Sequence, residues 1–175
     1  MDARDWRHVH PLDAFRDDHL AIRERIADLE AHLDRAVNVR RLTAESTGEF
    51  RGDAEFLEDF LLDHFRSEDE SLLPAVERHL GRHGESMVDI LWQEHEELRR
   101  AVRKFAEALD AAIPAAGGSG TVEELNRHGL FLVQVLQDHV RKEELAFFPK
   151  AREVLTEAEW TEVAERLHAV RGDSR

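Results

Sequence analysis

DHFRSE at residues 63–68 and DHVRKE at residues 138–143 are two copies of one sequence block, 75 positions apart. In each copy a histidine and a glutamate are separated by four positions, so on a helix both side chains project from the same face. Each copy runs on to two apolar residues and a proline, LLP at 72–74 and FFP at 147–149. The repeat predicts a helical protein built from two matching halves.

A further histidine lies upstream of each block. It stands in the pair DH at 18–19 and in the pair EH at 94–95, which are 76 positions apart. The interval between upstream and downstream histidines is 45 residues in the first half and 44 in the second. Together the two halves supply four imidazoles and two carboxylates, a set that can hold two metal ions.

Composition narrows the classes of protein that the chain can represent. Its 175 residues suit one domain with a real core, and its formal net charge of −14 argues against nucleic-acid and anionic-membrane partners. There is no long apolar run and no signal-peptide pattern, so we expect a cytoplasmic protein. The chain has no cysteine, which excludes disulfides, thiolate metal sites and iron–sulfur clusters held by its own residues.

Two stretches carry apolar or histidine side chains at alternating steps of three and four residues, within 12–33 and 88–109. This spacing predicts two long helices with His19 and His95 on their inner faces. Pro11 suits the first turn of the earlier helix. His32 is turned away from this inner face, so we expect it to be solvated.

The two HxxxE blocks predict two more helices. The earlier of these should begin between Thr43 and Asp53, and Pro74 should disturb or end it; Pro149 lies beyond the later one. Residues 113–121 read as a loop, and residues 157–170 as a shorter amphipathic helix packed outside the others.

We therefore predict an all-α fold, an up-down-up-down four-helix bundle with a short extra C-terminal helix. Residues 1–10 would form a polar N-terminal segment, 11–150 the bundle, and 151–175 the C-terminal helix and tail. The upstream histidines lie near helix starts, and each downstream histidine lies 10 residues before a proline. In antiparallel helices all four would therefore meet at one level of the bundle.

The simplest assignment gives each metal ion one histidine from each of two helices. A single HxxxE pair is usually a surface ion pair, and a single histidine among apolar residues is usually a hydrogen-bonded core residue. Here six groups converge, and burying them without a ligand would be costly. His19 and His64 are expected on one metal, His95 and His139 on the other, and Glu68 and Glu143 as bridges between them.

These residues and intervals resemble the hemerythrin-like, HHE cation-binding family over residues 11–149. The resemblance implies a cofactor of two iron ions, a non-haem di-iron centre with two bridging glutamates and an oxo or hydroxo bridge. Its oxygen-carrying members have another histidine one turn after the third-helix ligand. This chain has Arg99 there and Arg23 at the matching place, and arginine is a poor metal ligand.

The resemblance therefore implies an open position on both metals rather than reversible oxygen carriage. The four-histidine, two-glutamate pattern is similar to that of bacterial proteins linked to peroxide breakdown and of iron-centre repair proteins linked to nitric oxide stress. The repair proteins usually add a cysteine-bearing N-terminal segment, and this sequence has no cysteine.

We expect the protein to bind a small oxidant or gas, O2, H2O2 or NO, at this centre. The alternative is a catalase-like enzyme that disproportionates hydrogen peroxide, and a third reading is a structural bundle that holds zinc or nothing. Arg23 and Arg99 should be solvated ion pairs, or else gate the pocket. The side chains expected to form an apolar shell, or plain core, are Phe15, Phe60, Trp92 and Val135.

Overall fold

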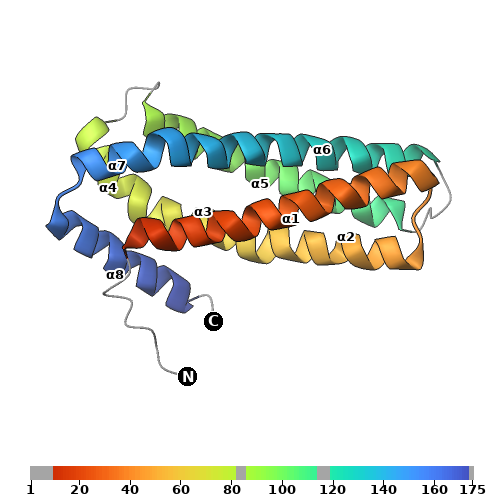
Figure 1. Ribbon diagram of the computed structural model, residues 1–175, viewed down its shortest axis with the longest axis horizontal. Coiled ribbons are helices and arrows are strands. Elements are labelled where there is room, and N and C mark those ends of the chain that lie inside the picture. The colour runs from red at the N-terminus through yellow and green to blue at the C-terminus, as the bar shows by residue number, and fades with distance from the viewer. Residues whose placement is uncertain (1–9, 82–85, 114–118, 174–175) are drawn as a thin grey trace.

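Long helical rods lie side by side in the computed structural model, and one shorter helix crosses an end of the bundle (Figure 1). The structure describes residues 10–81, 86–113 and 119–173. Within these ranges every regular element is helical. The predicted all-α bundle is therefore confirmed at the level of fold class. No helix in the described ranges is long and apolar enough to cross a membrane.

The first rod is α1, Pro11–Val39, which begins as the sequence predicts. Pro11 occupies the first turn, and the His10 side chain accepts a hydrogen bond from the Leu12 N–H. The rod ends at Arg40, whose φ of 58° is left-handed and turns the chain back. Thr43 then forms a capping box with Ser46, which fixes the start of the next helix.

The second rod is continuous although it contains Pro74. It consists of α2 (Ala44–Phe56), η2 (Leu57–Leu61), α3 (Leu62–Ser67), η3 (Glu68–Leu72) and α4 (Leu73–Leu80). The η segments are π-helical turns, and in the last of them the Leu73 N–H bonds the Glu68 carbonyl, five residues back. A π turn widens the backbone just before the proline ring, so Pro74 disturbs the helix without ending it.

The other half repeats this arrangement. After α5 (Met87–Ala112), the fourth rod consists of α6 (Ser119–Lys142), η4 (Glu143–Phe147) and α7 (Phe148–Val154). The Phe148 N–H bonds the Glu143 carbonyl, so a π turn again precedes a proline and again begins at the predicted glutamate ligand.

The predicted loop at 113–121 is partly wrong, because α6 already begins at Ser119. Gly120 lies in the first turn of α6, where a glycine costs less than the roughly 1 kcal/mol of a helix interior. α6 packs against both α1 and α5, which stabilises the helix. The remainder of the predicted loop, residues 114–118, lies outside the described residues.

The C-terminal helix α8, Glu157–Asp173, packs on α1, α3 and η3 at one end of the bundle (Figure 1). Its buried residues are Trp160, Val163, Leu167 and Val170. They lie on one face at helical spacing, as the predicted amphipathic segment at 157–170 requires.

His32 is not solvated, contrary to the sequence-based prediction. Its Nδ1 lies 2.6 Å from Oδ2 of the fully buried Asp53 on α2, and its ring meets Phe50 edge-on. The prediction was wrong because α1 packs against both α2 and α6, so more than one face of this helix is buried.

The apolar core is divided into two clusters, and the predicted ligands lie between them. One cluster contains Ile22 and Leu98, and the other contains Phe15 and Leu91. On α1 and α5 the predicted histidines fall between these apolar neighbours in the sequence. A polar layer therefore crosses the bundle where the two clusters meet.

Candidate metal centre

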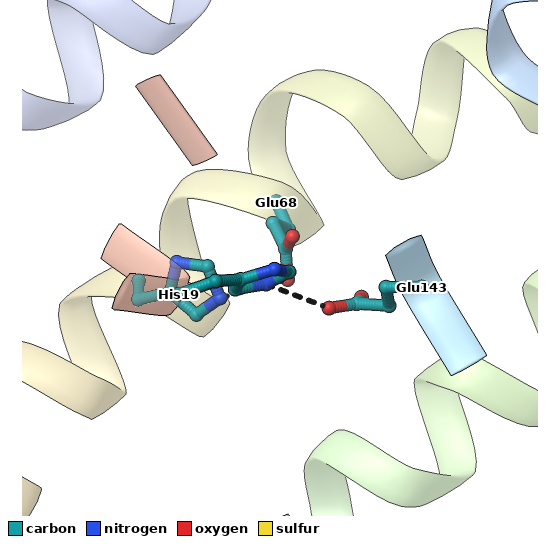
Figure 2. Close-up of side chains that lie close together, drawn as sticks. His19, Glu68 and Glu143 are labelled. Carbon is teal, nitrogen blue, oxygen red and sulfur yellow. Dashed lines mark ion pairs between the residues drawn. The ribbon is translucent and has the colours of Figure 1, made fainter. Parts of the chain in front are cut away.

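The structure brings all six sequence-predicted ligands together in this polar layer. They come from four rods, His19 from α1, His64 and Glu68 from the second, His95 from α5, and His139 and Glu143 from the fourth. None is more than 3 % exposed. Figure 2 shows His19, Glu68 and Glu143 pointing toward one another, with 3.1 Å between His19 Nε2 and Glu143 Oε2.

Within the described chain the ligands form two groups that share both glutamates. Nitrogen and carboxylate oxygen atoms of His19, His64, Glu68 and Glu143 all lie within 4.8 Å of one another, and so do those of Glu68, His95, His139 and Glu143. Each group thus has two histidines of its own and shares both glutamates with the other group, as the sequence-based assignment expects of two neighbouring metal sites.

Each of the four histidines also contacts a second carboxylate through its other ring nitrogen. In every case Nδ1 lies within hydrogen-bond distance of an Asp or Glu, which favours a proton on Nδ1 and turns Nε2 toward the centre. The pairs are His19–Glu144 at 3.1 Å, His64–Asp18 at 3.1 Å, His95–Asp69 at 2.6 Å and His139–Glu94 at 3.0 Å.

Sequence reasoning missed these four carboxylates, although each is the sequence neighbour of a predicted ligand. Asp18 and Glu94 precede the upstream histidines, and Asp69 and Glu144 follow the two glutamates. Their repetition in both halves was the available signal. A residue next to a ligand turns to a different side of the same helix, so each of these carboxylates reaches a histidine of a neighbouring rod instead.

Every one of these carboxylates is paired with a cation on its outer side. The pairs are Arg171–Asp18, Arg99–Asp69, Lys142–Glu94 and Arg23–Glu144. Arg23 and Arg99 therefore form ion pairs, as predicted, but these pairs are not merely solvated ones. Through Glu144 and Asp69 the two arginines support the histidines one turn earlier in their own helices.

The close approach of histidines and carboxylates shifts their pKa values. Burial lowers the pKa of His95, but hydrogen bonds to Asp69 and Glu68 outweigh it and raise the pKa to about 9. Burial opposes the charged form of His19 as well, yet contact with Glu143 leaves its pKa raised. Burial alone would raise the pKa of Glu143, and the neighbouring His139 and His19 instead hold it well below its usual range.

The centre contains buried polar atoms with no hydrogen-bond partner among the described residues. These atoms are His19 Nε2, His64 Nε2 and both carboxylate oxygens of Glu68 and of Glu143. Some lie close to one another, as the 3.1 Å contact above shows, but without the alignment of a hydrogen bond. An unsatisfied buried polar atom costs about 1–3 kcal/mol, so atoms gathered in this way indicate a ligand. Imidazole and carboxylate together fit a metal site.

Aromatic rings enclose the histidines. Phe148 stacks on His19 at 5.3 Å, and Phe65 stacks on His95 at 4.6 Å. Of the predicted apolar shell, Phe15 meets the ring of His64 edge-on at 6.0 Å. The other predicted members are partly buried and pack on the two core clusters, Phe60 and Val135 on one and Trp92 on the other. These rings help to keep the four histidines buried.

A helical bundle with a buried layer of histidine and glutamate defines a class of non-haem metal-binding proteins. The family model described as hemerythrin HHE cation binding domain matches residues 10–151, with a second, overlapping match at 87–170, and the chain belongs to this family. It is also 23% identical over 157 residues to the iron-sulfur cluster repair protein YtfE of Pectobacterium carotovorum subsp. carotovorum (strain PC1). That similarity covers 86% of this chain and 70% of the relative.

Proposed function

We propose that this protein holds two iron ions and binds a small oxidant or gas, O2, H2O2 or NO, at them. His19 and His64 would hold one ion and His95 and His139 the other, within an up-down-up-down arrangement of the four rods. Glu68 and Glu143 would bridge the ions, because both belong to both ligand groups. The observation that carries the proposal is the fixed orientation of the rings, since a carboxylate on each Nδ1 turns each Nε2 inward.

The ligand chemistry suits a transition metal such as iron rather than calcium or magnesium. Thiolate ligands are absent from the sequence, and a mixture of imidazole and carboxylate suits iron better than it suits calcium or magnesium. Helical bundles build di-iron carboxylate sites from side chains on facing helices. The similarity to a protein named for iron–sulfur cluster repair also supports iron.

When bound, the ions would supply redox chemistry and positions open to a small ligand. The residues of the chain orient the ligand atoms, exclude bulk water and hold protons on the Nδ1 atoms. The six ligands are at most 3 % exposed, which favours a small ligand over a large organic substrate at the centre itself. Arg23 and Arg99 pair with carboxylates on the outer side of the histidines, so they fill no place at the centre.

The test is to load the protein anaerobically with ferrous iron and expose it to O2 or NO. A new charge-transfer band in the near-ultraviolet or visible spectrum is expected, and it should be absent from Glu68→Ala carried through the same steps. An unchanged spectrum of the loaded wild-type protein with each gas would overturn gas binding.

Peroxide disproportionation is the second candidate, and one observation favours it. Each group offers only two histidines and two shared glutamates, so both metals rather than one would have room for substrate. Oxygen release from added hydrogen peroxide, followed with an oxygen electrode, measures this activity. Release no greater than that of an equal amount of free iron would exclude a catalase-like enzyme.

A further inference from the structure

The two halves of the centre differ in the source of one cation. In the second half, Lys142 pairs with Glu94, which contacts His139, so the cation and the histidine belong to the same rod. The matching position in the first half is 75 residues earlier, where the buried Ser67 provides no charge. There the cation comes from elsewhere in the chain, from Arg171 in the last turn of α8.

Arg171 contacts two of the groups that hold His64 in place. Its guanidinium pairs with Asp18, whose other contact is His64 Nδ1, at 3.1 Å. The same guanidinium lies over the ring of Phe15, 5.8 Å from its centroid, and Phe15 meets the His64 ring edge-on. Removing Arg171 would therefore loosen both the electrostatic and the aromatic support of one ligand.

A cavity of about 360 Å3 adjoins this part of the centre. Its lining includes Asp18, Asp63, His64, Ser67 and Arg171. At the corresponding place in the second half, the Lys142 side chain pairs with Glu94. The cavity thus reaches the outer side of His64, where α8 contributes the Arg171 side chain to the lining.

We propose that Arg171 is a positioning residue through which α8 clamps the metal position of His19 and His64, and that this ion exchanges through the adjoining cavity. The inference rests on the proposed two-metal function. It predicts that the two metal ions leave at different rates although both have the same kinds of ligand. Release of the ion at His19 and His64 would depend on α8, and release of the ion at His95 and His139 on the fourth rod.

The experiment measures the release of ferrous iron from the anaerobically loaded full chain to a coloured chelator. In Arg171→Ala one of the two ions should leave about 10-fold faster, in line with the 10–100-fold effects of groups that orient metal ligands, and the other ion should leave at the wild-type rate. Ser67→Lys added to Arg171→Ala should restore slow release, because it places a lysine where the second half has one.

Arg78→Ala is the matched control. Arg78 also fastens α8, through Glu162 at 3.0 Å, and its side chain is 44 % exposed against 39 % for Arg171. Release from this variant should follow the wild type. Equal rates in all variants, or equal acceleration of both ions by Arg171→Ala and Arg78→Ala, would overturn the proposal.

Two outcomes separate this inference from the function on which it rests. A wild-type chain that holds no iron contradicts the proposed function, whereas two irons released at rates indifferent to Arg171 contradict only the clamp. Should Arg171→Ala fail to fold by circular dichroism, Ser67→Lys alone decides: slower release of one ion supports the clamp, and an unchanged rate contradicts it.

Discussion

The first half of the molecule, α1 to α4, and the second half, α5 to α7, present the same ligands with different support. Both halves place a histidine on the inner face of one rod and an HxxxE pair on the next rod. In both halves a π turn begins at the glutamate. The second half supplies both of its supporting cations, Arg99 and Lys142, whereas the first supplies Arg23 and borrows Arg171 from α8. Ligand geometry is thus encoded twice in local sequence, and so is its support except for this one cation.

The largest expected effect on metal binding comes from removing a glutamate that both ligand groups share. Glu68→Ala should release both ions, with a loss of metal affinity on the order of 100-fold or more, because a bridge and a negative charge are lost together. Glu143→Ala should match it. Iron content after desalting measures the effect, with the exposed neighbour Glu70→Ala as control. Full iron content in Glu68→Ala would show that this residue is no bridge.

A smaller effect is expected from the carboxylates on Nδ1. Asp69→Asn and Glu144→Gln remove a charge without changing size, and each should weaken metal binding about 10–100-fold. Competition with a chelator of known affinity measures this, and the exposed Asp138→Asn should have no effect. If Asp69→Asn binds metal as tightly as the wild type, the Nδ1 contacts do not orient the rings.

Metal binding should strengthen as pH rises from 6 toward 9, because a histidine must lose its proton to bind a metal. With the pKa of His95 raised to about 9, loading near neutral pH should release protons, which an indicator dye in weak buffer detects. The protonated form stabilises the metal-free protein fully below the unfolded value of 6.5, and this contribution is lost as pH rises through about 9. A metal-free melting temperature that rises between pH 7 and 10 would contradict the raised pKa.

The smallest expected effects are on the free energy of unfolding, and they come from glycines in the second and fourth rods. A Cβ added at Gly129 would lie 2.6 Å from Cδ1 of the buried Leu33, whereas Gly52 has nothing within 4 Å. Gly129→Ala should destabilise by about 1 kcal/mol, since overpacking of about 1–3 kcal/mol exceeds the helix-propensity gain of about 1 kcal/mol. Gly52→Ala should stabilise by about 0.5–1 kcal/mol. Urea unfolding measures both, and effects of equal sign would count against this packing.

The sequence was sufficient to predict the helices and the convergence of six side chains. The alternating steps of three and four residues placed His19 and His95 on inner faces, and four-residue spacing paired His64 with Glu68. These are local properties of single helices, and local periodicity reports them directly.

The support of the centre could not be predicted in the same way. Asp18 is next to His19 in the sequence but contacts His64 on another rod, and Arg171 reaches it from a helix outside the bundle. Such contacts depend on how rods are rotated and spaced, which periodicity leaves open. The same reason explains His32, which was expected in solvent but lies against Asp53 of the neighbouring rod.

The most direct test of the two-metal centre is the iron content of the wild-type chain after anaerobic ferrous loading and desalting. Two ions per chain are expected, because two ligand groups share Glu68 and Glu143. One ion or none per chain, or a preference for substoichiometric zinc, would contradict a paired centre.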